Sequence, residues 1–208
     1  SEISEQNIVK RMRKPVPYIL QHCLAYGVTV TLQSIRENWE AGRKSGYGGT
    51  TLVPALFGND ITETSLVQTV GELGMKTLLV GFNGGDGPSN LKLAEYQQAL
   101  ENLRPVARMI VALAEKDLCE PIMVGPVHCH HRQLLPMGYK ETDLDRWFDC
   151  LQKLAEEFGI KVAIEFLNEV EDKTEEPLGR IINAIREGRD RLQIHWDTGH
   201  AHMRGLKA

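Results

Sequence analysis

Residues 194–202 read IHWDTGHAH, a short apolar run that leads into acidic and histidine side chains. Asp197 closes the run, and His200 follows three residues later in a turn that contains Gly199. Divalent metals favour carboxylate and imidazole ligands, and a strand end holds such ligands rigidly. The stretch therefore predicts a strand that ends in a polar site. If other strands end in the same way, their number and order indicate the fold.

Six apolar runs of strand length occur in the chain, at residues 28–33, 52–57, 77–82, 122–127, 162–166 and 192–197. Most are nearly continuous, as in strands that are buried on both faces of a parallel sheet. Between them, helices are predicted at 35–45, 62–73, 96–114, 144–158 and 177–188. In the last three, apolar residues recur every three or four positions. Pro105 is expected to kink or break the third of these helices. Repeated βα units predict a parallel sheet that is either doubly wound or closed into a barrel.

The placement of the polar residues favours the barrel. Acidic, amide and histidine residues follow several different strands, at 83–86, 128–131, 165–171 and 197–202. Chemistry gathered from many strand ends is typical of an α/β fold of the TIM type, a (β/α) barrel. A doubly wound nucleotide-binding sheet would instead place a G-x-G-x-x-G sequence after its first strand. Neither Gly48-Gly49 nor Gly84-Gly85 belongs to such a sequence.

The predicted barrel is incomplete. Eight βα units take about 250 residues, whereas the sixth predicted strand ends at Asp197 and the sequence stops at Ala208. Residues 1–27 read as an N-terminal helical extension, which leaves residues 28–208 as a partial barrel of about six units. We therefore expect strands seven and eight to be missing. Assembly into a homo-oligomer is one way to cover the two open edges.

Composition and charge limit the partners and the compartment. The 208 residues are 42% hydrophobic and 25% charged, and their formal net charge of −4 gives no reason to expect nucleic acid as a partner. No apolar run approaches the ~18 residues of a membrane span, and residues 1–14 contain no signal-peptide core. The four cysteines form no C-x-x-C pair and read as reduced thiols. We expect a cytoplasmic protein with no membrane partner.

Three segments together resemble the xylose isomerase-like barrels, and especially their ketose 3-epimerase branch, which includes tagatose and psicose epimerases. Residues 121–128, PIMVGPVH, are similar to the fourth strand of that branch. Residues 162–171, VAIEFLNEVE, are similar to its fifth strand and the loop that follows. Residues 196–200, WDTGH, are similar to its sixth strand.

The resemblance implies a role for each of five residues. Glu165 matches the carboxylate that ends the fifth strand, binds the metal and exchanges a substrate proton, and Asp197 matches a second metal ligand. His200 matches a histidine that contacts substrate oxygens, and Glu171 matches a substrate-binding acid. His128, which follows the fourth strand, is a further candidate for substrate binding. The two other ligands of the family, a His and a Glu, come from strands seven and eight, which this sequence lacks.

The implied function is that of a divalent-metal-dependent ketose isomerase or epimerase, or of a truncated relative of one. The substrate would be a small-molecule sugar, and the metal Mn, Co, Mg or Zn. This chemistry needs a carboxylate base to remove a carbon-bound proton and a cation to stabilise the resulting enediolate. Metal binding is expected to be weak or absent if the chain truly ends at Ala208, because half of the ligands would be missing.

Each of these residues has a plainer interpretation. Glu165 can belong to a buried ion pair, Asp197 can cap a helix beside a solvent-facing His200, and His128 can simply be hydrogen-bonded in place.

Two other function classes also stay open. Endonuclease IV-like DNA-repair barrels share the Asp-Thr-x-His pattern, but they use further histidines, and the third predicted strand ends at Phe82-Asn83 without one. The acidic balance also opposes a DNA partner. The remaining alternative is a shortened, non-catalytic barrel that serves as a binding or oligomerising module.

Overall fold

The computed structural model describes the backbone of residues 19–21, 29–81, 93–125, 141–165, 182–183 and 186–195. Side chains are described for residues 29–81, 97–125, 145–164, 182–183 and 186–195. Within this part of the chain, no helix combines the length and the hydropathy needed to cross a membrane.

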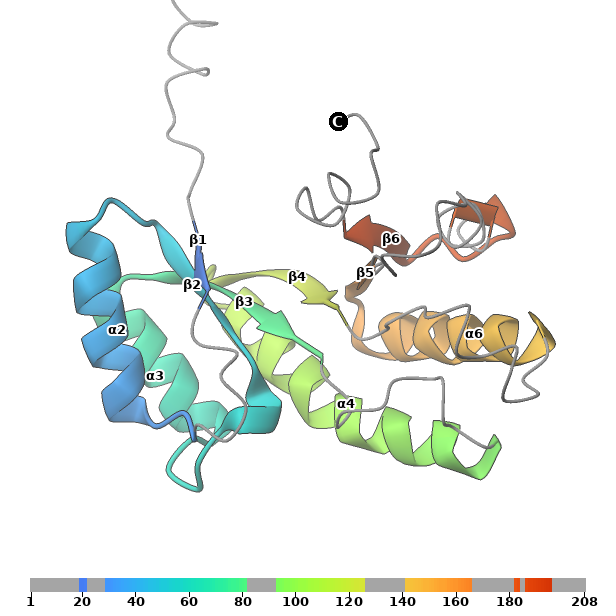
Figure 1. The fold of residues 1–208 in the computed structure, drawn as a ribbon, viewed down its shortest axis with the longest axis horizontal. Helices are drawn as coiled ribbons and strands as arrows, with labels where there is room; N and C mark the ends of the chain where they lie inside the picture. Colours follow the sequence, from blue (N-terminus) through green and yellow to red (C-terminus); the bar gives the residue numbers. More distant parts are fainter. Residues whose placement is uncertain are drawn as a thin grey trace, which may run out of the picture.

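Strands and helices alternate along the chain, as Figure 1 shows. The strands are β1 (Ile19–Gln21), β2 (Gly49–Leu52), β3 (Lys76–Val80), β4 (Cys119–Val124), β5 (Lys161–Glu165) and β6 (Leu192–His195). The helices are α2 (Leu32–Lys44), α3 (Glu63–Leu73), α4 (Leu93–Ala114) and α6 (Glu141–Phe158), with a 3₁₀ turn η1 at Pro54–Leu56.

The strands form one parallel sheet whose spatial order is the order of the chain, β1-β2-β3-β4-β5-β6. A doubly wound sheet reverses its strand order at a switch point, whereas a barrel adds each new strand on the same side as the last. The described strands contain no reversal. The structure therefore confirms the barrel prediction over the doubly wound alternative, and the sheet is a partial barrel.

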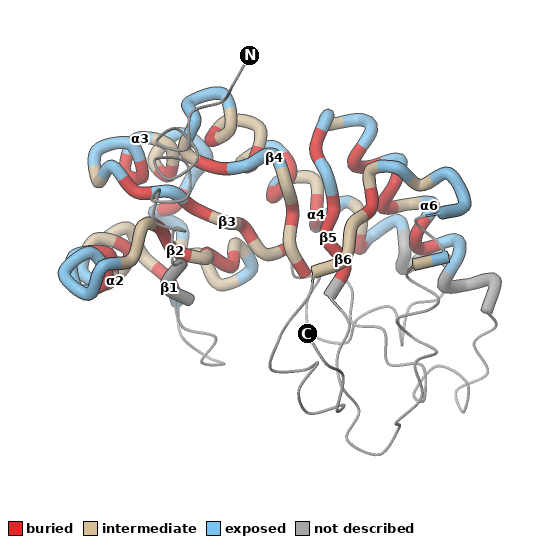
Figure 2. Tube along the Cα trace, turned by 90° about the horizontal axis from the view of Figure 1, so that it is seen from above, coloured by how far each residue is buried: buried red, intermediate tan, exposed pale blue. Residues whose placement is uncertain are grey.

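One row of side chains across the sheet faces the helices. Leu52, Leu79, Met123, Val162 and Leu192 are aligned from strand to strand by the register, and each is at most 1% exposed. They join buried residues of α2, α3, α4 and α6 in a single hydrophobic core. In Figure 2 the buried segments lie along the strands and on the helix sides that meet them. The other face of the sheet is thus free to carry different residues.

Helix α3 shows why several helix ends could be predicted. Thr62 accepts a hydrogen bond from the backbone of Ser65, and Ser65 bonds back to the backbone of Thr62, which forms a capping box at the start of the helix. Gly74 ends the helix at φ 61°, a left-handed conformation that favours glycine. The apolar face buries Leu66 and Val70. The prediction of a helix over residues 62–73 is confirmed to within one residue.

The first predicted strand, at residues 28–33, is wrong. Helix α2 begins at Leu32, because Thr31 and Ser34 form a capping box there, and Val30 makes only an isolated bridge to Phe57. The first strand of the sheet is instead β1, within the segment predicted as a helical extension. Over these three residues the extension is a strand, and the rest of residues 1–27 lies outside the described part of the chain. The division at residue 28 stays a prediction.

The second predicted strand, at residues 52–57, also lies too late in the sequence. Pro54 cannot donate to a sheet ladder and opens η1 instead, so the apolar run continues out of the strand. Strand β2 is formed by Gly49–Leu52, where the neighbouring strand comes close to the backbone. A Cβ at Gly49 would overlap the carbonyl of Lys76, since it would lie 2.9 Å from the carbonyl carbon. Glycine is therefore required by this close approach.

Replacing Gly49 by Ala is expected to lower the free energy of unfolding by about 1–3 kcal/mol, because the added methyl group must push β2 and β3 apart. Gly71→Ala is the matched control. The nearest atom to a Cβ at Gly71, in α3, is 3.7 Å away, so this change should stabilise by roughly 0.5–1 kcal/mol. Urea unfolding of both variants measures the difference. Equal stabilities would contradict the proposed overlap.

Helix α4 runs through Pro105, so of the expected kink or break the break does not occur. Proline removes one backbone donor and leaves the carbonyl four residues earlier without its helical partner. Both Pro105 and Glu101 are exposed, so water can bond that carbonyl. The buried face of the same helix, with Leu103, Ala107 and Ile110 nearly inaccessible, holds the two halves against the sheet.

Candidate active site

Strands β5 and β6 end side by side at the carboxyl edge of the sheet. Their register pairs Ile164 with Ile194 and Glu165 with His195. Neighbouring strands lie about 4.8 Å apart, so the backbones of Glu165 and His195 are direct neighbours. The described part of β6 ends two residues before Asp197.

Alternation along the strands assigns these positions to the face turned away from the helices. Ile164 is fully buried in the core, and Ile194 packs against that core. Successive residues of a strand point to opposite faces, so the positions of Glu165 and His195 lie on the other side of the sheet. In a closed barrel this side is the interior, and its upper end opens toward the active site.

A row of three apolar residues and one glutamine lies directly below these two positions. Val80, Val124, Ala163 and Gln193 are aligned across β3, β4, β5 and β6. Ala163 is buried, whereas the other three are half-buried, unlike the inaccessible row that faces the helices. The interior face thus changes from mainly apolar residues to Glu165 and His195 at the carboxyl edge. Polar residues above a mainly apolar floor are the arrangement expected of a barrel active site.

The five residues predicted for the site are described unequally. Glu165 is the last residue of β5, which places it at a strand end on the interior face, although its side chain is not described. His128, Glu171, Asp197 and His200 lie outside the described residues, so their roles stay predictions.

His195 is a residue that the sequence analysis did not select. The register with Glu165 brings it to the candidate site, and its side chain is half-buried. The signal for finding it was the period of two along a strand, which puts residues 195 and 197 on one face. His195, two residues before the candidate metal ligand Asp197, was therefore as good a candidate as His200, three residues after it.

The donor chemistry at this edge fits a divalent cation. Carboxylate oxygen and imidazole nitrogen, the groups carried by Glu165 and His195, suit Mn, Co and Zn, while carboxylate also suits Mg. No group of three metal-ligating side chains occurs among the residues with described side chains, a set that excludes both Glu165 and Asp197.

Cys119, by contrast, has no place in this chemistry. It begins β4, at the edge of the sheet opposite to Glu165, and its thiol donates a hydrogen bond of 2.9 Å to the carbonyl of Glu120. Burial raises the pKa of the Cys119 thiol to about 11 and also raises the pKa of Cys150. A nucleophilic cysteine needs a lowered pKa. Both cysteines in the described part of the chain are free thiols, as the sequence predicted.

Alkylation of native Cys119 at pH 8 is expected to be at least about 100-fold slower than that of an unfolded thiol. Only the thiolate reacts, and a pKa of about 11 leaves roughly one thiol in a thousand ionised at that pH. Ionisation rises with pH, so the rate should climb steadily between pH 8 and 11. Iodoacetamide labelling, followed by mass spectrometry of the Cys119 peptide with and without urea, provides the measurement. Rapid native labelling at pH 8 would contradict it.

Comparison with known proteins agrees with this geometry. The model of the family described as "Xylose isomerase-like TIM barrel" matches residues 39–207. No curated protein matches the chain significantly in sequence. Among solved structures, the 3-keto-D-glucoside 4-epimerase YcjR from E. coli shares 17% identity at a TM-score of 0.59, covering 89% of this chain and 69% of that one.

Two further structures are similar in the same way. A D-psicose 3-epimerase solved in the presence of D-fructose shares 15% identity at a TM-score of 0.62, covering 90% of this chain and 65% of that one. A xylose isomerase domain protein from Alicyclobacillus acidocaldarius shares 12% identity at a TM-score of 0.62, covering 91% of this chain and 66% of that one. The chain thus spans about two thirds of the length of these structures, and at such identities they show the fold alone. Because the family match extends over most of the sequence, the chain belongs to the xylose isomerase-like TIM barrel family.

Proposed function

We propose that this chain is a divalent-metal-dependent ketose isomerase or epimerase that acts on a small-molecule sugar. The observation that carries the proposal is the position of Glu165, which ends β5 on the interior face beside the end of β6. Epimerases among the structures with the same fold support the choice of substrate class.

Glu165 is proposed as the catalytic base. It would remove a proton from the carbon next to the sugar carbonyl, which is work that a positioned carboxylate can do. Glu165 and Asp197 are the proposed metal ligands. Asp197 follows β6 by two residues, and β6 is the direct neighbour of β5. A bound Mn, Co, Mg or Zn ion would supply charge stabilisation to the enediolate oxygens.

His128, Glu171 and His200 are proposed to bind and orient the sugar hydroxyls. They follow β4, β5 and β6, which are consecutive strands of the sheet. The carboxyl ends of parallel strands meet at one edge, so segments that leave these strands start from the same side of the barrel. This common origin supports assigning the three residues to one site.

The test is proton exchange at a sugar carbon. Ketoses of five and six carbons are incubated with the protein in D₂O with Mn²⁺ or Co²⁺, and deuterium uptake is followed by NMR. We expect deuterium at a carbon next to the carbonyl, and none when EDTA replaces the metal. Metal binding without exchange at any carbon would overturn the proposal.

We also propose that the protein is cytoplasmic. The net charge of −4 supports the further proposal that nucleic acid is not a partner. A homo-oligomer is also proposed, because β1 and β6 are the outer strands of the described sheet and each pairs there with a single neighbour. Exposed strand edges readily pair with another chain.

Light scattering over a range of protein concentrations is expected to show a dimer or a larger assembly formed through these outer strands. A strictly monomeric species at high micromolar concentration would remove the oligomer from the proposal. It would also count against the alternative of a non-catalytic oligomerising module.

A further inference from the structure

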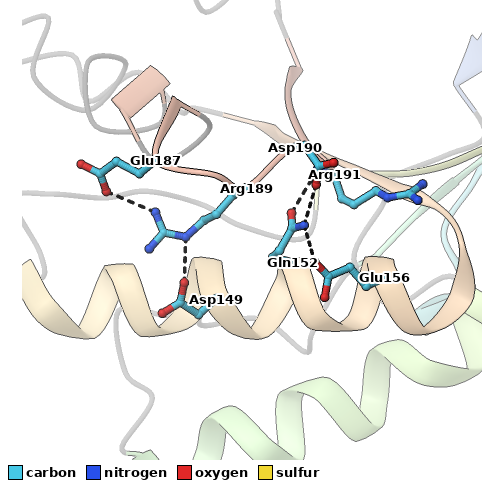
Figure 3. A network of polar contacts seen from close by, with 7 residues as sticks. All are labelled: Asp149, Gln152, Glu156, Glu187, Arg189, Asp190 and Arg191. Carbon is cyan, nitrogen blue, oxygen red and sulfur yellow. Dashed lines mark hydrogen bonds and ion pairs between the residues drawn. The ribbon is translucent and has the colours of Figure 1, made fainter.

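A polar stripe on α6 holds the turn that leads into β6. Asp149, Gln152 and Glu156 are spaced by three and four residues, so they share one side of the helix. Figure 3 shows them facing the turn at residues 187–191. Arg189, whose side chain is 11% exposed, bonds Asp149 through Nε at 2.9 Å.

Gln152 is the centre of this stripe. Its side-chain carbonyl Oε1 accepts a hydrogen bond from the backbone N–H of Arg191 at 3.0 Å. Its amide Nε2 donates to Asp190 Oδ1 and to Glu156 Oε1, each at 2.8 Å. The residue is 7% exposed, so these bonds replace water almost completely. Gln152 therefore fixes both the side chain of Asp190 and the backbone of the residue just before β6.

Arg191, whose backbone Gln152 holds, also makes the first hydrogen bond between β5 and β6. The carbonyl of Arg191 accepts a hydrogen bond of 2.9 Å from the N–H of Val162. The rungs that follow pair Val162 with Leu192 and, three residues later, Glu165 with His195. A strand that slips by one residue turns all of its side chains to the other face. The starting point of β6 thus decides which of its residues reach the interior beside Glu165.

Burying an amide side chain costs free energy unless its polar atoms are hydrogen-bonded. An apolar side chain of similar size would pack in the same place without needing three partners. The neighbouring buried positions of α6, Leu151 and Leu154, are indeed apolar. We propose that Gln152 is a positioning residue of the candidate active site, which sets the register of β6 so that His195 lies opposite Glu165. The active-site part of this inference rests on the function proposed above, whereas the register part does not.

The experiment compares Gln152→Met with Gln98→Met. Methionine keeps the length of the side chain and loses all three hydrogen bonds of Gln152. Gln98 is an exposed residue of α4 that bonds Asn102, so its replacement controls for the change of residue type. Three properties are measured in each protein: amide hydrogen exchange, inter-strand nuclear Overhauser contacts, and affinity for Mn²⁺ alone.

In Gln152→Met, the amides of Arg191 and Val162 should exchange about tenfold faster. The reference is the amide of Gly81, which bonds the carbonyl of Val124 between β3 and β4. The contacts between residues 165 and 195 should weaken, and Mn²⁺ affinity should fall by about 10–100-fold. Gln98→Met should match the wild type in all three.

Unchanged exchange and unchanged contacts in Gln152→Met would overturn the register role. Altered register with unchanged Mn²⁺ affinity would overturn the active-site role. If the wild type itself binds no Mn²⁺, the metal dependence of the proposed function fails, while exchange and contacts still decide the register. Should Gln152→Met not fold, Asp190→Ala removes one of the three bonds at an exposed residue, and it should speed exchange at Val162 in the same direction.

Discussion

Glu165→Gln is expected to reduce deuterium exchange into the ketose by about 10²–10⁴-fold, the range that a general base contributes. The amide has nearly the shape of the carboxylate but cannot accept the proton. Because Glu165 ends β5 and its backbone pairing is unaffected by the change, the melting temperature should stay within a few degrees. The measurement is the initial rate of exchange by NMR at saturating Mn²⁺.

Glu115→Gln is the matched control for this experiment. Glu115 is exposed and follows α4, at the edge of the sheet opposite to Glu165, so its replacement should leave the exchange rate unchanged. A Glu165→Gln variant that retains more than about a tenth of the wild-type rate would remove Glu165 from the role of base. A similar loss in both variants would instead indicate a general effect of charge.

Phe148→Ala is expected to lower the free energy of unfolding by about 3–5 kcal/mol, which is the cost of truncating a buried aromatic residue. Phe148 is 1% exposed and belongs to the core in which α6 packs against α4 and β5. Its removal leaves a cavity in this core. Urea unfolding followed by circular dichroism gives the free energy.

Lys153→Ala, at an exposed position of the same helix, controls for a change in helix propensity and should stay within about 0.5 kcal/mol of the wild type. A loss of less than about 1 kcal/mol in Phe148→Ala would show that the site collapses around the missing ring. In that case Phe148 would contribute less to the core than its burial indicates.

Helices were predictable wherever their signals lay close together in the sequence. Thr62 and Gly74 bracket α3, and α6 ends at Phe158, the predicted end, with Gly159 at φ 65° after it. A cap and the turn it closes are only three or four residues apart, so no distant contact is needed to form them. Helix α2 was less evident, because it begins at Leu32, inside the run at residues 28–33 that reads as a strand.

Strand boundaries were predicted less well, because they depend on partners far along the chain. Residues 49–51, Gly-Thr-Thr, lack an apolar pattern, yet they form β2 because β1 and β3 pair with them on either side. Residues 32 and 33 lie in an apolar run and still enter a helix. β-structure responds to its surroundings more strongly than helix does.

The sequence alone determined that the chain consists of repeated βα units and that an acidic residue lies near the end of the fifth strand, which was predicted at 162–166, because apolar period and strand-end polarity are local properties. Only the tertiary structure decided that the strands follow one another in order, that β1 lies at 19–21, and that His195 stands beside Glu165. These features could not be read from the sequence because they depend on the register between strands. The register depends on hydrogen bonds such as those of Gln152 to Asp190 and Arg191. These bonds join residues nearly forty positions apart in the sequence.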